Sequence, residues 1–160
     1  MSRQFPALNL PPANLRLKEE NGETKVFDPI RQKWVELTPE EWVRQHFTAW
    51  LQSEFGYPAS LIANEISLDL NGSRKRSDTV VFRRDGHPYI IVEYKAPTIA
   101  ISQDVFDQIV RYNMKLQADY LIVSNGINHY CCKIDYKNNT YNFIPKIPDY
   151  SHIASGSSEN

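Results

Sequence analysis

From residue 62 to residue 94 the chain alternates short apolar stretches with turn signals, a pattern that predicts three successive strands. The expected strands are residues 62–70, 78–83 and 89–94. Asn71-Gly72 and Asp85-Gly86 separate them, and such dipeptides favour tight hairpin turns. The third stretch is apolar at almost every position, which is typical of a central strand covered on both faces.

A helical spacing follows. Residues three or four positions apart form one apolar face: Val105, Ile109, Tyr112 and Leu116. This periodicity predicts a helix over residues 103–117. A short apolar strand is expected at residues 120–124, and residues 128–134 and 140–144 should form a closing hairpin.

An earlier helix has clear start signals. Thr38 is the expected N-cap, Pro39 suits the first helical position, and Glu41 follows Thr38 by three residues, as in a capping box. The helix should end before Gly56. Helices interspersed with strands predict a mixed α/β sheet with helices on its faces.

The two ends of the chain have their own patterns. Residues 1–37 combine a proline-containing, loose or extended arm with a short hairpin around Asn21-Gly22 and a third short strand. Residues 38–150 should form the core of a single domain. Residues 151–160 are rich in Ser and Gly, so we expect a disordered tail.

Composition narrows the classes of protein. The chain is 41% hydrophobic and 23% charged, which suits a soluble globular protein, and it contains neither a signal-peptide pattern nor a membrane span. Cys131 and Cys132 are adjacent, so a disulfide is not expected and a reducing cytoplasm fits best. A net charge of −1 argues against a surface coated in positive charge, but it leaves room for a local basic patch beside an acidic site.

Candidate chemistry gathers at the end of the central strand. Side chains alternate faces, so Tyr89, Ile91, Glu93 and Lys95 should share one face. Pairing across the hairpin at Asp85-Gly86 should bring Asp78 beside Glu93 and Lys95. Two carboxylates meeting there would suit Mg²⁺. Taken separately, a Glu-x-Lys is more often a surface or structural pair, and only the combination with Asp78 favours a site.

Asp78 followed by Glu93-x-Lys95 resembles the PD-(D/E)XK nuclease motif. More narrowly, the chain resembles the N-terminal nuclease domain of type I restriction enzyme R (motor) subunits. The matching stretches are Arg76-Ser77-Asp78-Thr79-Val80-Val81, Val92-Glu93-Tyr94-Lys95-Ala96-Pro97, Gln108-Ile109-Val110-Arg111-Tyr112-Asn113 and Ser124-Asn125-Gly126. The family's leading Pro-Asp is Ser77-Asp78 here, which leaves the role of the aspartate intact.

The resemblance implies a restriction-endonuclease-like fold and Mg²⁺-dependent hydrolysis of DNA phosphodiester bonds, with Mn²⁺ as a substitute. Asp78 and Glu93 would be metal ligands, and Lys95 would activate water or stabilise charge. An acidic residue of the first helix often joins the metal ligands in this fold. Glu41 is the candidate, with Glu65 as a weaker alternative, but Glu41 could equally serve only the helix cap.

Further residues follow from the same resemblance. Gln108 and Tyr112 match the Q-x-x-x-Y element, where they would contact the phosphate or hold Lys95; without the resemblance, Tyr112 would be assigned to the core. Three basic residues before Asp78 are expected in a loop, either gripping DNA phosphates or simply solvated, and Arg44 is a further candidate. The three are Arg74, Lys75 and Arg76.

The expected partners are DNA and either a separate motor or specificity subunit or a second copy of the chain. The sequence has no phosphate-cradling Gly-x-x-x-x-Gly-Lys-Ser/Thr loop, so it should not move DNA by itself. A rival hypothesis is a non-catalytic module that uses a nuclease fold to bind nucleic acid or protein.

Overall fold

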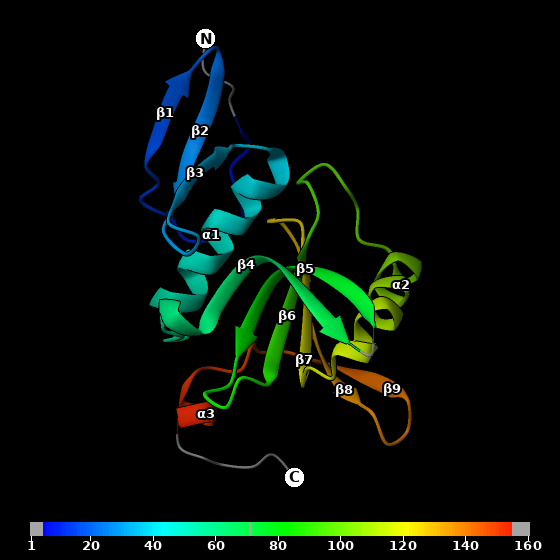
Figure 1. Ribbon diagram of the computed structural model, residues 1–160. Helices are drawn as coiled ribbons and strands as arrows, with labels where there is room; N and C mark the ends of the chain where they lie inside the picture. Colours follow the sequence, from blue (N-terminus) through cyan, green and yellow to red (C-terminus); the bar gives the residue numbers. More distant parts are fainter. Residues whose placement is uncertain (1–4, 71, 155–160) are drawn as a thin grey trace.

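The computed structural model describes residues 5–70 and 72–154 (Figure 1). The strands are β1 Leu17–Glu20, β2 Glu23–Asp28, β3 Lys33–Glu36, β4 Ile62–Leu70, β5 Ser73–Phe82, β6 Pro88–Tyr94, β7 Tyr120–Ser124, β8 His129–Asp135 and β9 Thr140–Ile144. The helices are α1 Pro39–Ser53, α2 Gln103–Asn113 and α3 Ser151–Ala154, with 3₁₀ turns η1 Ala59–Leu61 and η2 Met114–Leu116.

Two sheets organise the molecule. The small N-terminal sheet is antiparallel, in the order β1-β2-β3, and the main sheet has the order β4-β5-β6-β7-β8-β9. Neighbours in the main sheet are antiparallel except β6 and β7, which are parallel because α2 crosses over between them. The expected mixed α/β sheet with flanking helices is confirmed.

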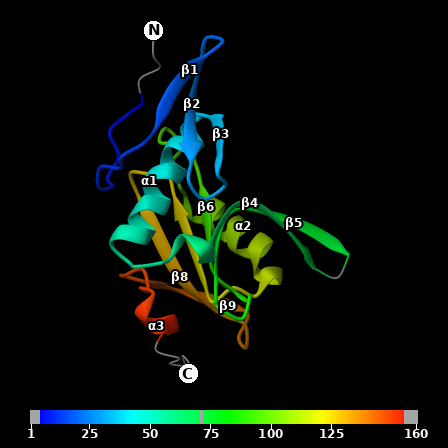
Figure 2. The ribbon, with the colours of Figure 1, turned by 60° about the vertical axis from the view of Figure 1, so that its left-hand side comes forward.

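Helix α1 covers one face of the main sheet and α2 the other, and α1 also lies beside the small sheet (Figures 1 and 2). Ile90, Val92 and Tyr94 of β6 pack in one cluster with Phe47 of α1, whereas Ile91 packs in the opposite cluster with Phe106 of α2. The prediction that β6 is a central strand buried on both faces is therefore correct.

The face assignment of Tyr89 was wrong. Tyr89 packs with the α1-side cluster rather than with Ile91. The pairing of β5 with β6 shifts register between Val81 and Phe82, and the shift interrupts strict alternation at the start of β6.

The start of α1 follows its sequence signals. The Thr38 hydroxyl accepts a hydrogen bond from the Glu41 N–H at 3.1 Å, and Pro39 occupies the first turn. The helix ends at Ser53, before Gly56, whose φ of +78° lies in the left-handed region that favours glycine. Local chemistry alone fixes both boundaries.

The buried face of α2 matches the predicted one only in part: Leu116 is buried and Ile109 packs against the same cluster, but other positions differ. Phe106, Val110 and Asn113 are buried, whereas Tyr112 is 44% exposed. The regular helix also stops at Asn113 and continues as a 3₁₀ turn rather than reaching residue 117. Phe106 packs with Ile91 and Leu121 of the sheet, where its large ring is buried.

The hairpin of β4 and β5 is longer than expected. Ser67 pairs with Arg76 and Leu70 with Ser73, so Arg74, Lys75 and Arg76 lie in a strand rather than in a loop. Backbone pairing thus continues to the turn, which includes Gly72 with φ of +79°. Figure 2 shows the end of this hairpin projecting away from the rest of the sheet.

The N-terminal arm is irregular but packed against the body. The Phe5 ring stacks on Trp42 with centroids 5.2 Å apart, and the Asn9 N–H donates to the Gly126 carbonyl at 2.8 Å. Gly126 has φ of +86°, and a Cβ there would lie 2.7 Å from Leu8 Cδ2. The description of this arm as loose is therefore corrected for residues 5–14.

The predicted start of the disordered tail, residue 151, is too early in the chain. Ser151–Ala154 form the short helix α3, while residues 155–160 lie outside the described part of the chain. The Tyr150 N–H donates to the Phe55 carbonyl at 2.8 Å, and Ile153 packs against the α1-side cluster. These contacts order the segment despite its polar composition.

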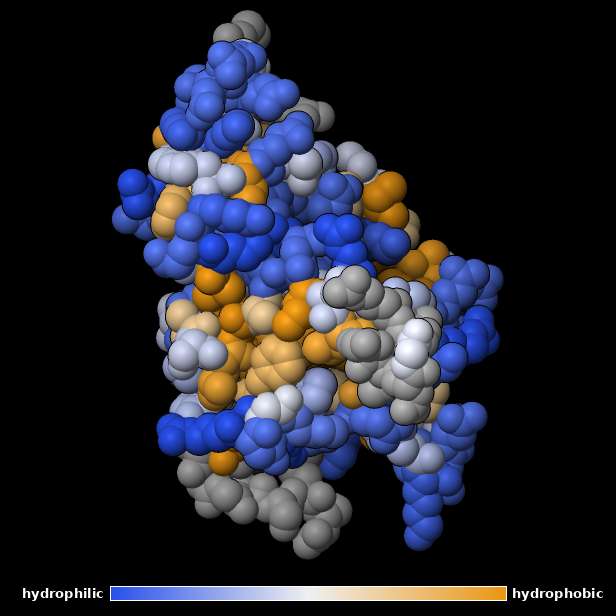
Figure 3. All heavy atoms as spheres, in the orientation of Figure 1, coloured by the Kyte–Doolittle hydropathy of each residue, from blue (hydrophilic) through white to orange (hydrophobic). Residues whose placement is uncertain are grey.

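The surface and the cysteines are ordinary. Figure 3 shows a mostly hydrophilic surface at the top of the view, over the small sheet, and an apolar patch in the middle. None of the helices within the described ranges has the length and apolar character of a membrane span. Cys131 and Cys132 are buried free thiols in opposite clusters, and burial raises the pKa of Cys132 to about 12.

Candidate metal and nuclease site

Antiparallel pairing of β5 and β6 brings the two central carboxylates together. Thr79 pairs with Val92, which places Asp78 next to Glu93 on the neighbouring strand. The Tyr94 N–H donates to Asp78 Oδ2 at 2.8 Å. The proximity expected from hairpin arithmetic is therefore correct.

Glu93 lies in an environment that disfavours its charge. Burial, followed by the charge of Asp78 and a hydrogen bond with it, raises the pKa of Glu93 to about 9. Hydrogen bonding from Asn113 and the ammonium of Lys95 lower this pKa only in part. Glu93 Oε1 is buried and has no hydrogen-bond partner within the described residues. A buried, unpartnered carboxylate oxygen is well suited to receive a proton or a cation.

The donor atoms of the pair are carboxylate oxygens, the kind of ligand that Mg²⁺ prefers. Across residues 5–70 and 72–154, no group of three or more His, Cys, Asp or Glu side chains gathers to hold a metal ion. Mg²⁺ typically keeps several waters and takes one or two carboxylates from the protein, together with oxygens of the substrate. Asp78 and Glu93 supply such a pair.

Glu65 lies on β4, next to Asp78. Asn64 pairs with Thr79 and Ile66 with Ser77, so Glu65 falls opposite Asp78 between these two pairs. The φ of Glu65 is +54°, in the left-handed region that a non-glycine residue rarely adopts. Glu65, Asp78 and Glu93 thus form a row across three adjacent strands, and strained backbone of this kind is concentrated at functional sites.

Glu41 takes part in the helix cap as expected, but only through its backbone, and its carboxylate pairs with other side chains. Its N–H completes the helix cap, but its carboxylate accepts from Arg31 Nη2 at 2.7 Å, Arg44 Nη1 at 2.5 Å and Gln45 Nε2 at 2.9 Å. Three donors occupy this carboxylate, so in this arrangement it is neither a reciprocal cap nor an open metal ligand. The sequence could not reveal that Arg31 pairs with Glu41, because Arg31 lies in the connection between β2 and β3.

Arg44 is buried between the carboxylates and does not reach the surface. It is 4% exposed; Nη2 lies 2.5 Å from Glu65 Oε1 and 3.8 Å from Asp78 Oδ1. Its tentative assignment as a DNA contact is therefore corrected, because a guanidinium enclosed by carboxylates cannot approach a DNA backbone.

The exposed face of α2 borders the site. The Arg76 N–H donates to the Tyr112 hydroxyl at 3.4 Å, and Gln108 is exposed one helical turn earlier. Tyr112 is thus beside β5 and outside the core. Arg76 has a side chain that is 73% exposed and donates through Nε to Glu65 Oε2 at 2.8 Å. Arg74 and Lys75 share its strand, and their side chains lie outside what the structure describes.

Sequence reasoning missed Asn113, which is 1% exposed and hydrogen-bonds Glu93. Its side chain also donates through Nδ2 to the Ile109 carbonyl at 2.8 Å. The available signal was a polar residue seven positions after Phe106, on a helix face that otherwise carries apolar residues.

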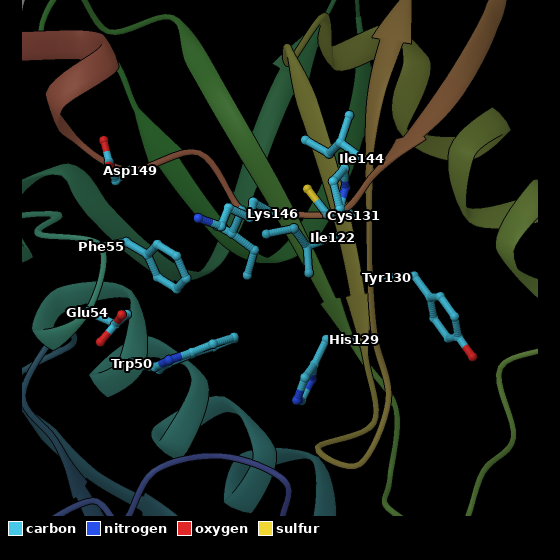
Figure 4. A pocket seen from close by; sticks show the side chains of 12 residues that line it. Trp50, Glu54, Phe55, Ile122, His129, Tyr130, Cys131, Ile144, Lys146 and Asp149 are labelled. Atoms are coloured by element: carbon cyan, nitrogen blue, oxygen red, sulfur yellow. The ribbon is translucent and has the colours of Figure 1, made fainter.

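A separate cavity of about 470 Å³ lies on the α1 side of the sheet (Figure 4). Trp50, Phe55 and Lys146 point toward it, and Tyr130 points away. His129 lines it with both ring nitrogens engaged, by the Ser124 hydroxyl at 2.7 Å and the Asn9 carbonyl at 2.8 Å, and burial lowers the pKa of His129. The carboxylate row lies outside this cavity.

Comparisons with known proteins point to one family. The model of the type I restriction enzyme R protein N terminus matches residues 39–148 of the chain. Among solved structures, a fragment described as an HsdR subunit of a type I restriction enzyme from Vibrio vulnificus YJ016 superposes with a TM-score of 0.53 at 20% identity. The match covers 74% of this chain and 25% of that one, so this chain spans about a quarter of that protein's length. No curated protein matches this chain.

Proposed function

Because the chain belongs to the family of type I restriction enzyme R protein N termini, we propose that it is a nuclease domain that hydrolyses DNA phosphodiester bonds with Mg²⁺. The observation that carries the proposal is the pair formed by Asp78 and Glu93. Its buried Glu93 Oε1 has no hydrogen-bond partner within the described residues, and the raised pKa of Glu93, due first to burial, supports a site where a cation would stabilise the carboxylate.

The residues around this pair have complementary roles. Asp78 and Glu93 would hold Mg²⁺, or Mn²⁺ in its place, and the bound metal would lower the pKa of water and offset charge on the phosphate. Lys95, whose charge acts on Glu93, would orient the attacking water and stabilise developing negative charge. Tyr112 and Gln108, on the exposed face of α2, would contact the phosphate.

The projecting hairpin of β4 and β5 is the proposed DNA contact. Its second strand carries three basic residues that lead directly to Asp78, and such side chains hold the DNA backbone without reading its sequence. The three are Arg74, Lys75 and Arg76. From its family, a motor or specificity subunit of a restriction enzyme, or a second copy of the chain, is proposed as its partner.

A nicking assay tests the proposal. Supercoiled plasmid is incubated with the protein and Mg²⁺ or Mn²⁺, and Glu93→Ala and Lys95→Ala are each expected to lower the rate more than about 100-fold, beyond the usual range for outer partners of a metal site. Glu54→Ala and Lys146→Ala, which remove the same chemical groups beside the separate cavity, should retain activity. Wild-type protein without activity, or equal activity in Glu93→Ala, would refute catalysis.

A binding module without catalysis is the second candidate. It is favoured by Arg44, whose guanidinium already pairs with Glu65 and lies 3.8 Å from Asp78, so this side of the carboxylates is partly neutralised without a metal. Calorimetric titration with Mn²⁺ separates the two functions. Uptake that is lost in Asp78→Asn supports the nuclease, whereas DNA binding without metal uptake supports the module.

A further inference from the structure

A buried series of ion pairs connects the small N-terminal sheet with Asp78. Arg31 donates through Nε to Asp28 at the end of β2 and through Nη2 to Glu41 at 2.7 Å. Glu41 in turn accepts from Arg44 Nη1 at 2.5 Å. Arg44 then reaches Asp78, with Nη2 at 3.8 Å from Oδ1. Arg31 thus bridges two carboxylates, and Arg44 contacts three, because it also pairs with Glu65.

Arg44 has the geometry of a fixed clamp. It is 4% exposed, its two terminal nitrogens are held by Glu41 and Glu65, and its guanidinium lies 5.5 Å from the centroid of the Tyr94 ring. Arg44 Nε has no hydrogen-bond partner within the described residues, so one donor remains uncommitted. A planar guanidinium held at both ends cannot rotate without breaking a charged hydrogen bond.

Tyr94 connects the clamp to Asp78 a second time. Its N–H donates to Asp78 Oδ2 at 2.8 Å, and its hydroxyl donates to Thr79 Oγ1 at 2.9 Å. Arg44 therefore lies against Asp78 itself and against the ring of Tyr94, the residue whose backbone N–H binds Asp78. Displacement of Arg44 should change the hydrogen bond between Tyr94 and Asp78.

We propose that Arg44 is a positioning residue of the nuclease site and that Glu41 acts through Arg44 rather than by binding metal. Glu41 fixes the guanidinium, and the guanidinium fixes Asp78 and Glu65. The catalytic consequence rests on the function proposed above, whereas the positioning itself is a property of the metal-free protein. The competing assignment makes Glu41 a direct ligand, and the two assignments differ in how variants combine.

The first experiment follows the Tyr94 amide by NMR in the metal-free protein of residues 1–160. Glu41→Gln keeps the shape of the side chain and removes its charge, while Arg44→Met removes the clamp. Both are expected to move the Tyr94 amide proton upfield, because its hydrogen bond to Asp78 lengthens. A double variant should move it no further than Arg44→Met alone. An unmoved resonance in Glu41→Gln would overturn the proposal.

Arg83→Met is the matched control. Like Arg44, Arg83 pairs with a carboxylate, that of Asp119, and lies over a tyrosine ring, that of Tyr89 at 4.7 Å. Arg83 differs in its location, because it follows the end of β5, away from Asp78. Its loss removes the same kinds of contact and should leave the Tyr94 amide in place. If Arg44→Met does not fold, Arg44→Lys takes its place, since lysine keeps the charge but cannot bridge Glu41 and Glu65 together.

The second experiment measures the affinity for Mn²⁺ by calorimetry. Glu41→Gln and Arg44→Met are each expected to weaken binding about 10–100-fold, the usual range for partners that hold a metal ligand in place. If Glu41 acts through Arg44, the double variant is no weaker than Arg44→Met. Effects that multiply would identify Glu41 as a direct ligand and refute the proposal.

The two proposals can fail separately. Wild-type protein that neither binds Mn²⁺ nor nicks DNA would refute the nuclease function, and the NMR experiment would still decide the positioning role. If the enzyme is active but the chemical shift of the Tyr94 amide does not change in Glu41→Gln, only the positioning role is refuted. In an active enzyme, Arg44→Met should lower kcat about 10–100-fold with little change in the KM for DNA, because Arg44 does not reach the substrate.

Discussion

The surroundings of Glu93 favour its protonated form over the charged carboxylate. Burial, and then the charge of Asp78, raises its pKa from 4.5 to about 9. Below pH 4.5 the group is protonated in both the folded and the unfolded chain. As the pH rises, the unfolded chain loses this proton first, so the free energy of unfolding falls by up to about 1.4 kcal/mol per pH unit. That loss continues until the folded group also ionises.

Removing this titration should flatten the pH dependence of stability. We expect the melting temperature of the wild type in EDTA to fall between pH 5 and pH 9 relative to that of Glu93→Gln, which cannot ionise. Thermal melts of both proteins at matched pH values give the difference directly. Parallel curves would show that Glu93 keeps an ordinary pKa.

At the scale of elements, the register of α2 decides which residues border the site. Because Phe106, Val110 and Asn113 face the sheet, Tyr112 is presented to β5 instead of the core. A rotation by one residue would bury Tyr112 and expose Phe106. The register of α2 therefore leaves Tyr112 on the candidate DNA-facing surface.

Two truncations on adjacent positions test this register. Phe106→Ala is expected to lower the free energy of unfolding by about 3–5 kcal/mol, because it leaves a cavity under α2. Val105→Ala, on the half-buried flank, should cost about 1 kcal/mol. Urea unfolding of the two variants makes the comparison, and a larger loss for Val105→Ala would restore the register that the sequence favours.

The sequence predicts elements where the decisive interactions are local. Thr38 and Gly56 set the ends of α1 by chemistry within one turn. Pairing of Asp78 with Glu93 follows from counting across one hairpin. The buried face of α2 could not be fully predicted in this way, because it depends on how Phe106 packs against strands that are distant in the chain.

The ion pairs around the site could not be predicted from the sequence either. Glu41 pairs with Arg31 from the small sheet, and Arg44 pairs with Glu65, which is 21 residues further along the chain. No periodicity or motif relates these positions. The strained backbone of Glu65 likewise has no sequence signal, since glutamate is not a residue that favours left-handed φ.

At the scale of the whole molecule, the small sheet is connected to the main sheet through Asp28. This carboxylate is fully buried and accepts from Arg31 and from Asn64 Nδ2 of β4 at 3.1 Å. Burial alone would raise the pKa of Asp28, but hydrogen bonds from Arg31 and Asn64 outweigh it and lower the pKa. Its stabilising contribution is therefore present above pH 3.8 and is lost as the pH falls through the lowered value.

Loss of Asp28 should weaken the whole domain. Asp28→Ala leaves the buried guanidinium of Arg31 with one partner fewer, and we expect a loss of about 3–5 kcal/mol in the free energy of unfolding. Glu20→Gln, which removes an exposed ion pair with Lys18, should change it by less than about 1 kcal/mol. Urea unfolding measures both, and equal small effects would mean that the two sheets are energetically independent.

The contact at Gly126 should control how often the N-terminal arm detaches from the folded core. The arm lies so close that a methyl group at Gly126 would sit 2.7 Å from Leu8 Cδ2, on a backbone already at φ +86°. Gly126→Ala should therefore make the arm detach more often while the core stays folded. The measurement is the rate at which a protease removes residues 5–14 while the rest of the protein resists cleavage.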